Sequence, residues 1–424
     1  MRSQCDTLSP WQRFVNTGRW IGCSVVVEVD VGAVVAGTLI YGSVLFSIAK
    51  TLVIPRGSLP KLAKIVDRSV DWIYGRVCAM TRSYERRDSI RSSQAVVFLF
   101  VMLVVWVATL MVALALMILP ALRSPGGALR EVGASFLTLG FTSTATPWAT
   151  FVDFLAGFTG LAIVAVQISY LPTLYSAYNR RETEVTLLSS RVGEPAWGPE
   201  LLARTRIGIV DAEVLGIYQA WERWAADVAE SHSTYPVLLR FRSPNPYASW
   251  VTGLLCVMDS AALYLAVAPS RAPLSARLML RMGFVCCRQI ARSVGIVFDP
   301  DPHPDDPVAL SFEEFLIGID RLRSVGFPLE RNPEEAWADF RGWRVNYESI
   351  LYKLAERLDA VPVRWSGGRR AMTMTLDSQR VVNRTPLHPD GESPQIYGPR
   401  QAQAKEAEAT FDDESSDITG TDLD

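Results

Sequence analysis

Long stretches without a charged residue dominate the first half of the chain. They cover residues 31–49, 95–122 and 154–179. As helices, all three are long enough to cross the hydrocarbon core of a bilayer, about 30 Å thick. Glu28 and Asp30 precede the first stretch, where a charge at the membrane interface costs less than one at the bilayer centre. The pattern predicts an all-α integral membrane protein with three transmembrane helices.

The basic residues predict the orientation of these helices. Segment 55–94 contains more Lys and Arg than Asp and Glu, and Arg180 and Arg181 follow the third stretch. Loops rich in Lys and Arg usually stay on the cytoplasmic side. We therefore expect the N-terminus outside and the C-terminal part in the cytoplasm. Segment 55–94 can also attract anionic lipid headgroups.

Residues 128–146, between the second and third stretches, read A-L-R-E-V-G-A-S-F-L-T-L-G-F-T-S-T-A-T. The first ten can form a short helix after a Ser-Pro-Gly-Gly turn at 124–127, and the rest form a strip rich in Thr and Gly. A short helix followed by an extended strip is typical of a re-entrant pore loop. The alternative is an ordinary connection on the outer side of the membrane.

Five residues of this strip, Thr138, Leu139, Gly140, Phe141 and Thr142, are similar to the T-V-G-Y-G filter, whose carbonyl oxygens replace the hydration shell of potassium. With its flanking helices, the strip resembles the pore module of the potassium channel family over residues 95–180. The resemblance implies an outer helix, a pore helix, a selectivity filter and an inner helix, in that order. Since one chain supplies one loop, it also implies a homotetramer.

The strip departs from the family pattern at two positions. Thr142 replaces the second glycine, and Ser143 replaces the acidic residue that commonly follows. A β-branched residue at positive φ costs about 1–2 kcal/mol, and loss of an acid lowers the local cation concentration. We therefore expect a weakly selective pore of low conductance.

Three residues of the third stretch are candidates for an inner-helix hinge or gate. Gly157 and Gly160 can supply a flexible point, or they can allow close helix packing. Pro172 removes a helical hydrogen bond and is expected to kink the helix.

The remaining residues divide into a helical cytosolic domain and a polar tail. Apolar residues recur at helical spacing over 212–230, and Ser311 and Asn332 are placed as helix N-caps. Segment 250–268 is apolar except for Asp259; because both flanks are basic, we interpret it as a buried cytosolic helix and not as a fourth span. The expected division of the chain is 1–54 for the N-terminal segment and first transmembrane helix, 55–94 for a basic cytoplasmic linker, 95–180 for the pore module, 181–365 for the cytosolic domain and 366–424 for a disordered acidic tail.

Candidate chemistry outside the strip is sparse. The six cysteines show no C-x-x-C spacing, and the three histidines lie far apart, so we expect no metal and no cofactor. His232 beside Ser233 is the one suggestive pair for an enzyme, and adjacency alone does not make a nucleophile and base. The acidic, proline-rich segment 299–307 fits a stiff surface linker better than a calcium loop.

The sequence therefore predicts a cation channel of the potassium type in a bacterial plasma membrane, with the lipid bilayer and other copies of the chain as partners and no nucleic acid. Monovalent cations, chiefly potassium, would be the permeant ions, and the cytosolic domain would be regulatory. The alternative, favoured by the missing glycine and acid, is a non-conducting membrane scaffold or signalling protein derived from a channel-like module.

Overall fold

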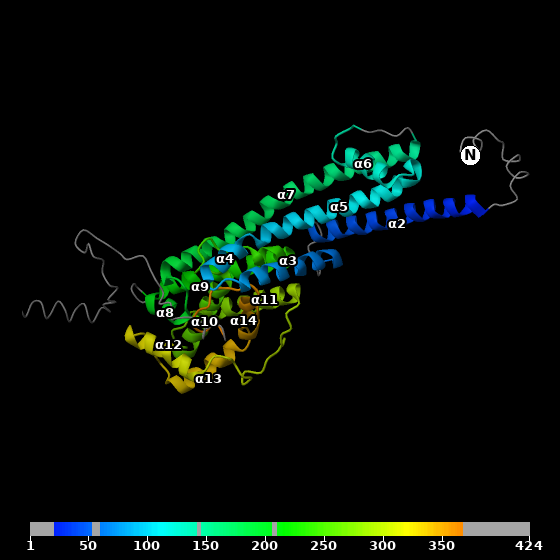
Figure 1. The fold of residues 1–424 in the computed structure, drawn as a ribbon. Coiled ribbons are helices and arrows are strands. Elements are labelled where there is room, and N and C mark those ends of the chain that lie inside the picture. Colours follow the sequence, from blue (N-terminus) through cyan, green and yellow to red (C-terminus); the bar gives the residue numbers. More distant parts are fainter. Residues whose placement is uncertain (1–20, 53–59, 142–145, 206–209, 368–424) are drawn as a thin grey trace, which may run out of the picture. The chain divides into compact units, whose positions relative to one another are not determined.

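The computed structural model describes residues 21–52, 60–141, 146–205 and 210–367, and every regular element in these ranges is a helix (Figure 1). The all-α prediction is confirmed for this part of the chain. The chain divides into two compact units. Unit 1 comprises residues 1–72 and 96–173; unit 2 comprises residues 73–95 and 174–424.

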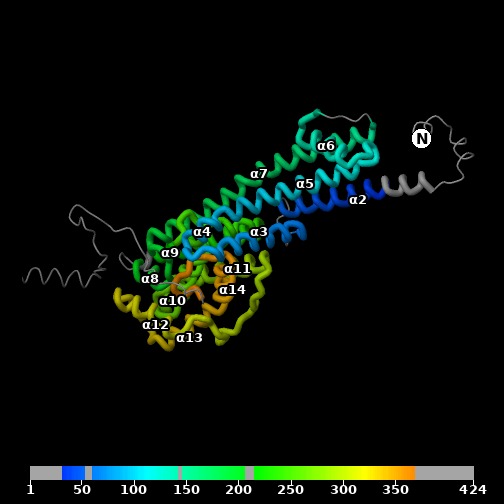
Figure 2. The backbone as a smooth tube through the Cα atoms, in the orientation of Figure 1, coloured from blue at the N-terminus to red at the C-terminus, as the bar shows by residue number. Residues whose placement is uncertain are grey.

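Unit 1 contains the long apolar helices predicted from the sequence (Figure 2). It consists of α2 (Ile21–Leu52), the first part of α3 (Lys61–Ala79), most of α5 (Gln94–Leu122), the short α6 (Pro125–Phe136) and the first part of α7 (Pro147–Val192). All three uncharged stretches are helical, and the third lies within a longer helix.

Small residues and a few polar contacts hold these helices together. Gly37 of α2 packs so closely on α5 that a Cβ atom there would lie 2.6 Å from the carbonyl oxygen of Ala113. The hydroxyl of Tyr41 on α2 is 2.7 Å from that of Thr159 on α7. Trp148 of α7 donates its indole N–H to the Met117 carbonyl of α5 at 2.8 Å. Close approach of backbones at small residues is a typical way to pack helices in a membrane.

Besides α10, three segments are long and apolar enough to cross a membrane: Val31–Leu52, Tyr84–Leu122 and Pro147–Val192. Only 22%, 28% and 33% of their most apolar stretches is buried within the protein. Much of this apolar surface therefore needs lipid or another chain to cover it.

The segment expected to be a linker, 55–94, contains α3 and the short α4 (Tyr84–Ser92), and its second half belongs to unit 2. Asp88 of α4 accepts a hydrogen bond from Arg242 at 2.6 Å, and Arg91 lies 3.3 Å from Asp359. These contacts attach α4 to the body of unit 2.

Unit 2 is a helical domain built around α10 (Trp250–Val267), and all 18 residues of that helix are buried. Burial of the apolar segment 250–268 is thus confirmed. Helices pack on it from several sides because it is apolar around its whole circumference. The other elements are α8 (Gly198–Thr205), α9 (Val210–Thr234), η1 (Pro236–Arg240), α11 (Leu274–Val294), α12 (Phe312–Ser324), α13 (Pro333–Arg344) and α14 (Glu348–Arg357).

The predicted helix starts in unit 2 are confirmed. The Ser311 side chain accepts from the amide of Glu314, whose carboxylate accepts from the Ser311 amide, a complete capping box. Asn332 accepts from the Glu335 amide at 2.9 Å. The tail beyond Gly367 lies outside the described residues.

Candidate functional site

Helix α6 corresponds to the predicted short helix, but it begins at Pro125, so the turn expected at 124–127 is wrong: Ser124 is the N-cap and the next three residues are the first helical turn. The Ser124 hydroxyl accepts a hydrogen bond from the Gly127 amide at 3.3 Å, and Pro125 occupies the first helical turn, where its missing N–H costs nothing. The helix has 12 residues, which gives a length of about 18 Å at 1.5 Å per residue. It is therefore too short to cross a bilayer core of about 30 Å.

The last turn of α6 is fixed against α7. A Cβ atom on Gly160 would lie 2.1 Å from the Phe136 carbonyl oxygen, so only glycine fits there. At Gly157, the same atom would lie 3.4 Å from the Ser135 carbonyl oxygen, an ordinary contact distance. Ser135 also donates to Asp153 of α7 at 2.8 Å. Of the two interpretations of these glycines, this geometry supports close packing at Gly160. Pro172 lies inside α7, which continues as a helix to Val192.

A Schellman motif ends α6. The Leu139 amide bonds to the Ala134 carbonyl at 2.7 Å, and the Thr138 amide bonds to the Ser135 carbonyl at 3.1 Å. This geometry requires positive φ at Thr138, where φ is 54°. Gly140 also has positive φ, 65°. Thr138 therefore carries backbone strain that the sequence pattern did not predict, and the strain expected at Thr142 stays a prediction.

The predicted filter strip lies at the surface of unit 1. The side chains of Leu137, Leu139 and Phe141 are all exposed, as are Thr138 and Gly140. The Thr138 hydroxyl donates to the Leu137 carbonyl at 2.7 Å. Thr142 lies outside the described residues, as does Ser143. In the described part of the strip, one chain thus presents backbone and apolar side chains outward without enclosing a site of its own.

Arg130 adds a charge to this site that the sequence analysis did not consider. Its guanidinium carbon lies 5.4 Å from the centre of the Phe141 ring, a cation–π distance. The signal was available, since Arg130 lies in the predicted pore helix, but its proximity to Phe141 depends on the turn at Thr138. A positive charge here raises the electrostatic energy of a cation approaching the strip.

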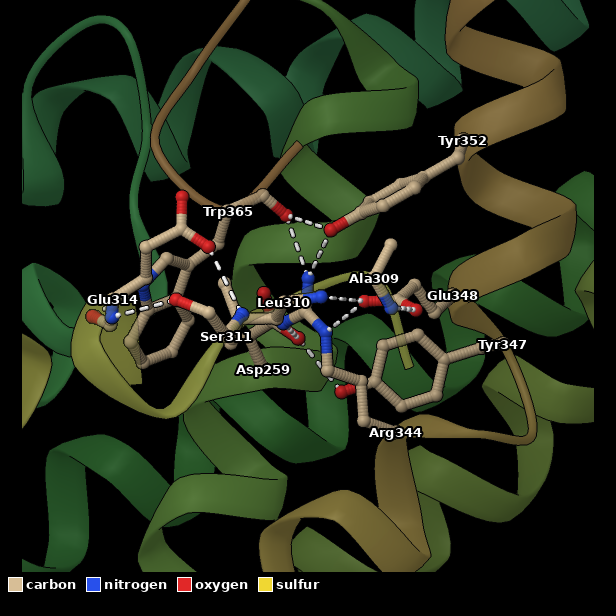
Figure 3. A network of polar contacts seen from close by, with 10 residues as sticks. All are labelled: Asp259, Ala309, Leu310, Ser311, Glu314, Arg344, Tyr347, Glu348, Tyr352 and Trp365. Carbon is tan, nitrogen blue, oxygen red and sulfur yellow. Dashed lines mark hydrogen bonds and ion pairs between the residues drawn. The ribbon is translucent and has the colours of Figure 1, made fainter. Parts of the chain in front are cut away.

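Unit 2 contains a buried polar network centred on Arg344 (Figure 3). Arg344 donates to Asp259 at 2.6 Å and to Glu348 at 2.9 Å. It also donates to the Tyr352 hydroxyl at 2.7 Å and to the Trp365 carbonyl at 2.6 Å. These contacts connect α13 to α10, to α14 and to the segment after α14.

Both acids of this network have further partners. Asp259 accepts from the Tyr347 hydroxyl at 2.7 Å, and Glu348 accepts from the amides of Ala309 and Leu310 at 2.5 Å and 3.1 Å. Burial is the main reason why the pKa of Asp259 is raised to about 6, while Arg344 and Tyr347 oppose the increase. The three charged side chains, Arg344, Asp259 and Glu348, are all buried, which fits a structural role.

A second buried network surrounds Arg181, which the sequence marked only as a cytoplasmic anchor. Arg181 donates to the carbonyls of Leu238 and Phe241 at 2.8 Å and 2.6 Å, and it lies 3.0 Å from Nε2 of His232. Since arginine has no acceptor, Nε2 must accept and Nδ1 carries the proton. Burial and the charge of Arg181 lower the pKa of His232. The partner of Nδ1 is Ser231, at 2.9 Å, and the Ser233 hydroxyl donates to the Glu230 carbonyl.

Among the described residues, no group of three or more His, Cys, Asp or Glu side chains is arranged to hold a metal ion. Four cysteines whose side chains the structure describes, Cys78, Cys256, Cys286 and Cys287, are free thiols and buried. The chain matches no family model, no curated protein and no solved structure. Its function must therefore be argued from its own residues.

Proposed function

We propose that the chain is a subunit of a potassium-channel-like cation channel, with residues 125–146 as a re-entrant pore loop. One observation carries the proposal. A helix too short to cross a bilayer, α6, packs with its last turn against the long apolar α7 and ends at the exposed strip Thr138–Phe141. In such a loop, the chain enters and leaves the membrane on the same side.

The exposed surface of α7 supports assembly from several copies. One side of the helix is buried within unit 1, and the other carries large apolar side chains that the chain leaves uncovered. These are Phe151, Phe154, Phe158, Leu161, Val164 and Ile168. Four copies around one axis would bring four strips together, which is what rings of carbonyl oxygens require. We therefore propose a homotetramer.

Two electrostatic contributions near the strip oppose each other. The carbonyl end of α6 carries the partial negative charge of the helix dipole, which favours a cation at the adjoining strip. The positive charge of Arg130, over the Phe141 ring, disfavours a cation at the strip. Together with the Thr and Ser at positions 142 and 143, this supports a weakly selective pore of low conductance, with potassium as the main permeant ion.

Ion flux from purified protein in liposomes tests the proposal, with potassium and sodium gradients compared. We expect slow flux with little preference for potassium. The double change Thr142→Gly with Ser143→Asp should raise the preference, and Arg130→Gln should raise flux for both ions alike. Arg123→Gln is the matched control, since Arg123 lies before the α6 cap and away from the strip in sequence. Absence of flux from all forms, in protein shown to be tetrameric, would contradict conduction.

A specific observation favours the alternative, a non-conducting membrane scaffold or signalling protein. The amides of Leu139 and Gly140 both bond to the Ala134 carbonyl, at 2.7 Å and 3.4 Å. Such a cap ends many helices that have no connection with ion transport. A stable dimer with no larger species in detergent, combined with absence of flux, would support the scaffold.

The proposed topology has three spans, the N-terminus outside and unit 2 in the cytoplasm. An impermeant thiol reagent tests it on chains with a cysteine at Ser143 or at Val297, an exposed position of unit 2. We expect labelling of Ser143→Cys from outside and of Val297→Cys only after permeabilisation. Labelling of both positions from the same side of the membrane would contradict the re-entrant loop. That result would concern the topology alone, and it would not contradict the helical fold of either unit.

A further inference from the structure

Helix α3 has two apolar faces, and only one of them is buried. Ala63, Val66, Val70 and Cys78 are at most 6% exposed. The other face carries large apolar side chains that the protein leaves uncovered. They are Ile65 (60% exposed), Trp72 (63%) and Ile73 (51%), followed just beyond the helix by Met80 (87%).

The exposed face also carries basic residues. At about 100° per residue, Lys61, Arg68 and Arg76 all project within about 60° of Ile65, and all three are exposed. By the same geometry, Asp67 and Asp71 lie more than about 100° from Ile65, on the other side of the helix. The uncovered face is therefore apolar and positively charged, with its acids directed elsewhere.

Chain connectivity places this face close to a bilayer. Lys61 follows Leu52, the end of the first candidate span, by nine residues, which limits their separation to about 30 Å. After α3, a short turn and α4 lead into α5, the second long apolar helix. Both ends of α3 are thus tied by short segments to helices that can cross a membrane.

We propose that α3 lies in the plane of the cytoplasmic membrane interface and that its exposed face binds anionic lipids. Ile65, Trp72 and Ile73 enter the boundary between headgroups and acyl chains, where Trp is favoured. Lys61 and Arg68 extend their charged ends to lipid phosphates, with their aliphatic stems along the apolar surface. This inference goes beyond the proposed channel function and does not depend on conduction.

Spin labels on single cysteines in the full chain, reconstituted in liposomes, test the position of the helix. Labels at Ile65→Cys and Ile73→Cys should collide more often with oxygen, which concentrates in the bilayer, than with a water-soluble nickel chelate. Lys64→Cys, on the flank of the helix, is the matched control and should show the reverse order. The parent chain, labelled in parallel, gives the background from native cysteines.

Each other outcome overturns the proposal. Higher accessibility to the nickel chelate at Ile65→Cys and Ile73→Cys would show that the face is in water. Low accessibility to both reagents would show that protein covers it, so that the partner would be another chain or another copy.

The headgroup contacts have a separate test. Spin-labelled phosphatidylglycerol and phosphatidylcholine are compared for association with the full chain. We expect a several-fold preference for phosphatidylglycerol, reduced toward equality by Lys61→Gln with Arg68→Gln. The control changes two exposed basic residues of unit 2, Arg277→Gln with Arg281→Gln, and should keep the preference. An unchanged preference in the α3 variant would rule out the headgroup contacts, even if the apolar face lies in the membrane.

Discussion

Helix α10 in unit 2 and the long helices of unit 1 are all long and apolar enough to cross a membrane, yet they differ in how far the protein buries them. The most apolar stretch of α10 is 100% buried within the protein, compared with 22–33% for Val31–Leu52, Tyr84–Leu122 and Pro147–Val192. The difference lies in what the same chain packs around each helix. Apolar character and length alone do not decide whether a helix crosses a membrane or forms a domain core.

Both units also contain buried acids. In unit 2, Asp259 accepts hydrogen bonds from Arg344 and Tyr347, which offset part of the cost of burying its charge. In unit 1, Glu131 of α6 is 4% exposed, and one of its carboxylate oxygens has no hydrogen-bond partner. Both units contain buried polar atoms without a hydrogen-bond partner. The contrast between the units therefore lies in their apolar surface, which is covered by the same chain around α10 and is largely exposed on the long helices of unit 1.

The largest expected effect comes from removing the buried cation at the centre of the Arg344 network in unit 2. Arg344→Met leaves Asp259 and Glu348 buried without their cation, which should lower the free energy of unfolding by about 3–5 kcal/mol. Denaturant unfolding of the full chain in detergent, followed by tryptophan fluorescence, measures it. The exposed pair of Arg323 and Asp320 gives the matched control, and Arg323→Met should cost less than about 1 kcal/mol. Equal effects of the two changes would contradict the structural role of the network.

The next largest effect is the change of the free energy of unfolding with pH that results from protonation of Asp259. Its pKa is raised to about 6 from 3.8, so between these pH values the folded state binds more protons than the unfolded state. Stability from this group is therefore complete below pH 3.8 and is lost as pH rises through 6. At about 1.36 kcal/mol per pKa unit, the total is about 3 kcal/mol.

The pH dependence is best measured as a difference between the parent and Asp259→Asn. His232, with its lowered pKa, contributes in the opposite direction, because stability is lost as pH falls below about 6.5. The contribution of His232 is the same in the parent and in Asp259→Asn, so it cancels in the difference between their free energies of unfolding. The parent should lose stability relative to the variant from pH 4 to pH 6 and change little above it. The opposite slope would show that the pair with Arg344 lowers the pKa of Asp259.

Much of the fold was predictable because it follows from local patterns. Uncharged stretches gave the three long helices, and basic flanks on both sides of 250–268 favoured a buried helix there. The capping residues Ser311 and Asn332 act within one turn of the chain, so three or four residues suffice to recognise them. The membrane position of these helices and the re-entrant loop remain predictions.

The rest depended on contacts between distant residues. Arg181 and Arg344 appear in the sequence as ordinary basic residues, and their burial depends on partners 50 or more positions away, at Leu238, Phe241 and Asp259. The strain at Thr138 could not be placed from the T-x-G-F pattern, because it arises from the Schellman cap of α6. The requirement for glycine at Gly160 depends on the position of Phe136.

A smaller effect tests the packing that fixes α6 in unit 1. Gly160→Ala places a Cβ atom 2.1 Å from the Phe136 carbonyl oxygen in the present geometry, and such overpacking typically costs about 1–3 kcal/mol. Gly157→Ala, one turn earlier in the same helix, is the matched control, because its Cβ atom meets only an ordinary contact. Thermal unfolding in detergent should therefore separate the two variants. If both are equally stable, α6 moves freely on α7, and the short helix is not held in place.

The smallest expected effect concerns Thr138, where strain and proposed function meet. With φ at 54°, a threonine costs about 1 kcal/mol more than a glycine. Thr138→Gly should therefore stabilise unit 1 by about 1 kcal/mol, and Thr138→Ala, which keeps the strain, should not. Both changes remove the hydroxyl that would line the proposed filter. If that hydroxyl contributes to conduction, flux should fall in both variants while stability rises in only one. An equal gain of stability in both would show that the hydroxyl, and not the backbone angle, is the source of strain; unchanged flux in both would show that Thr138 does not line the path of the ion.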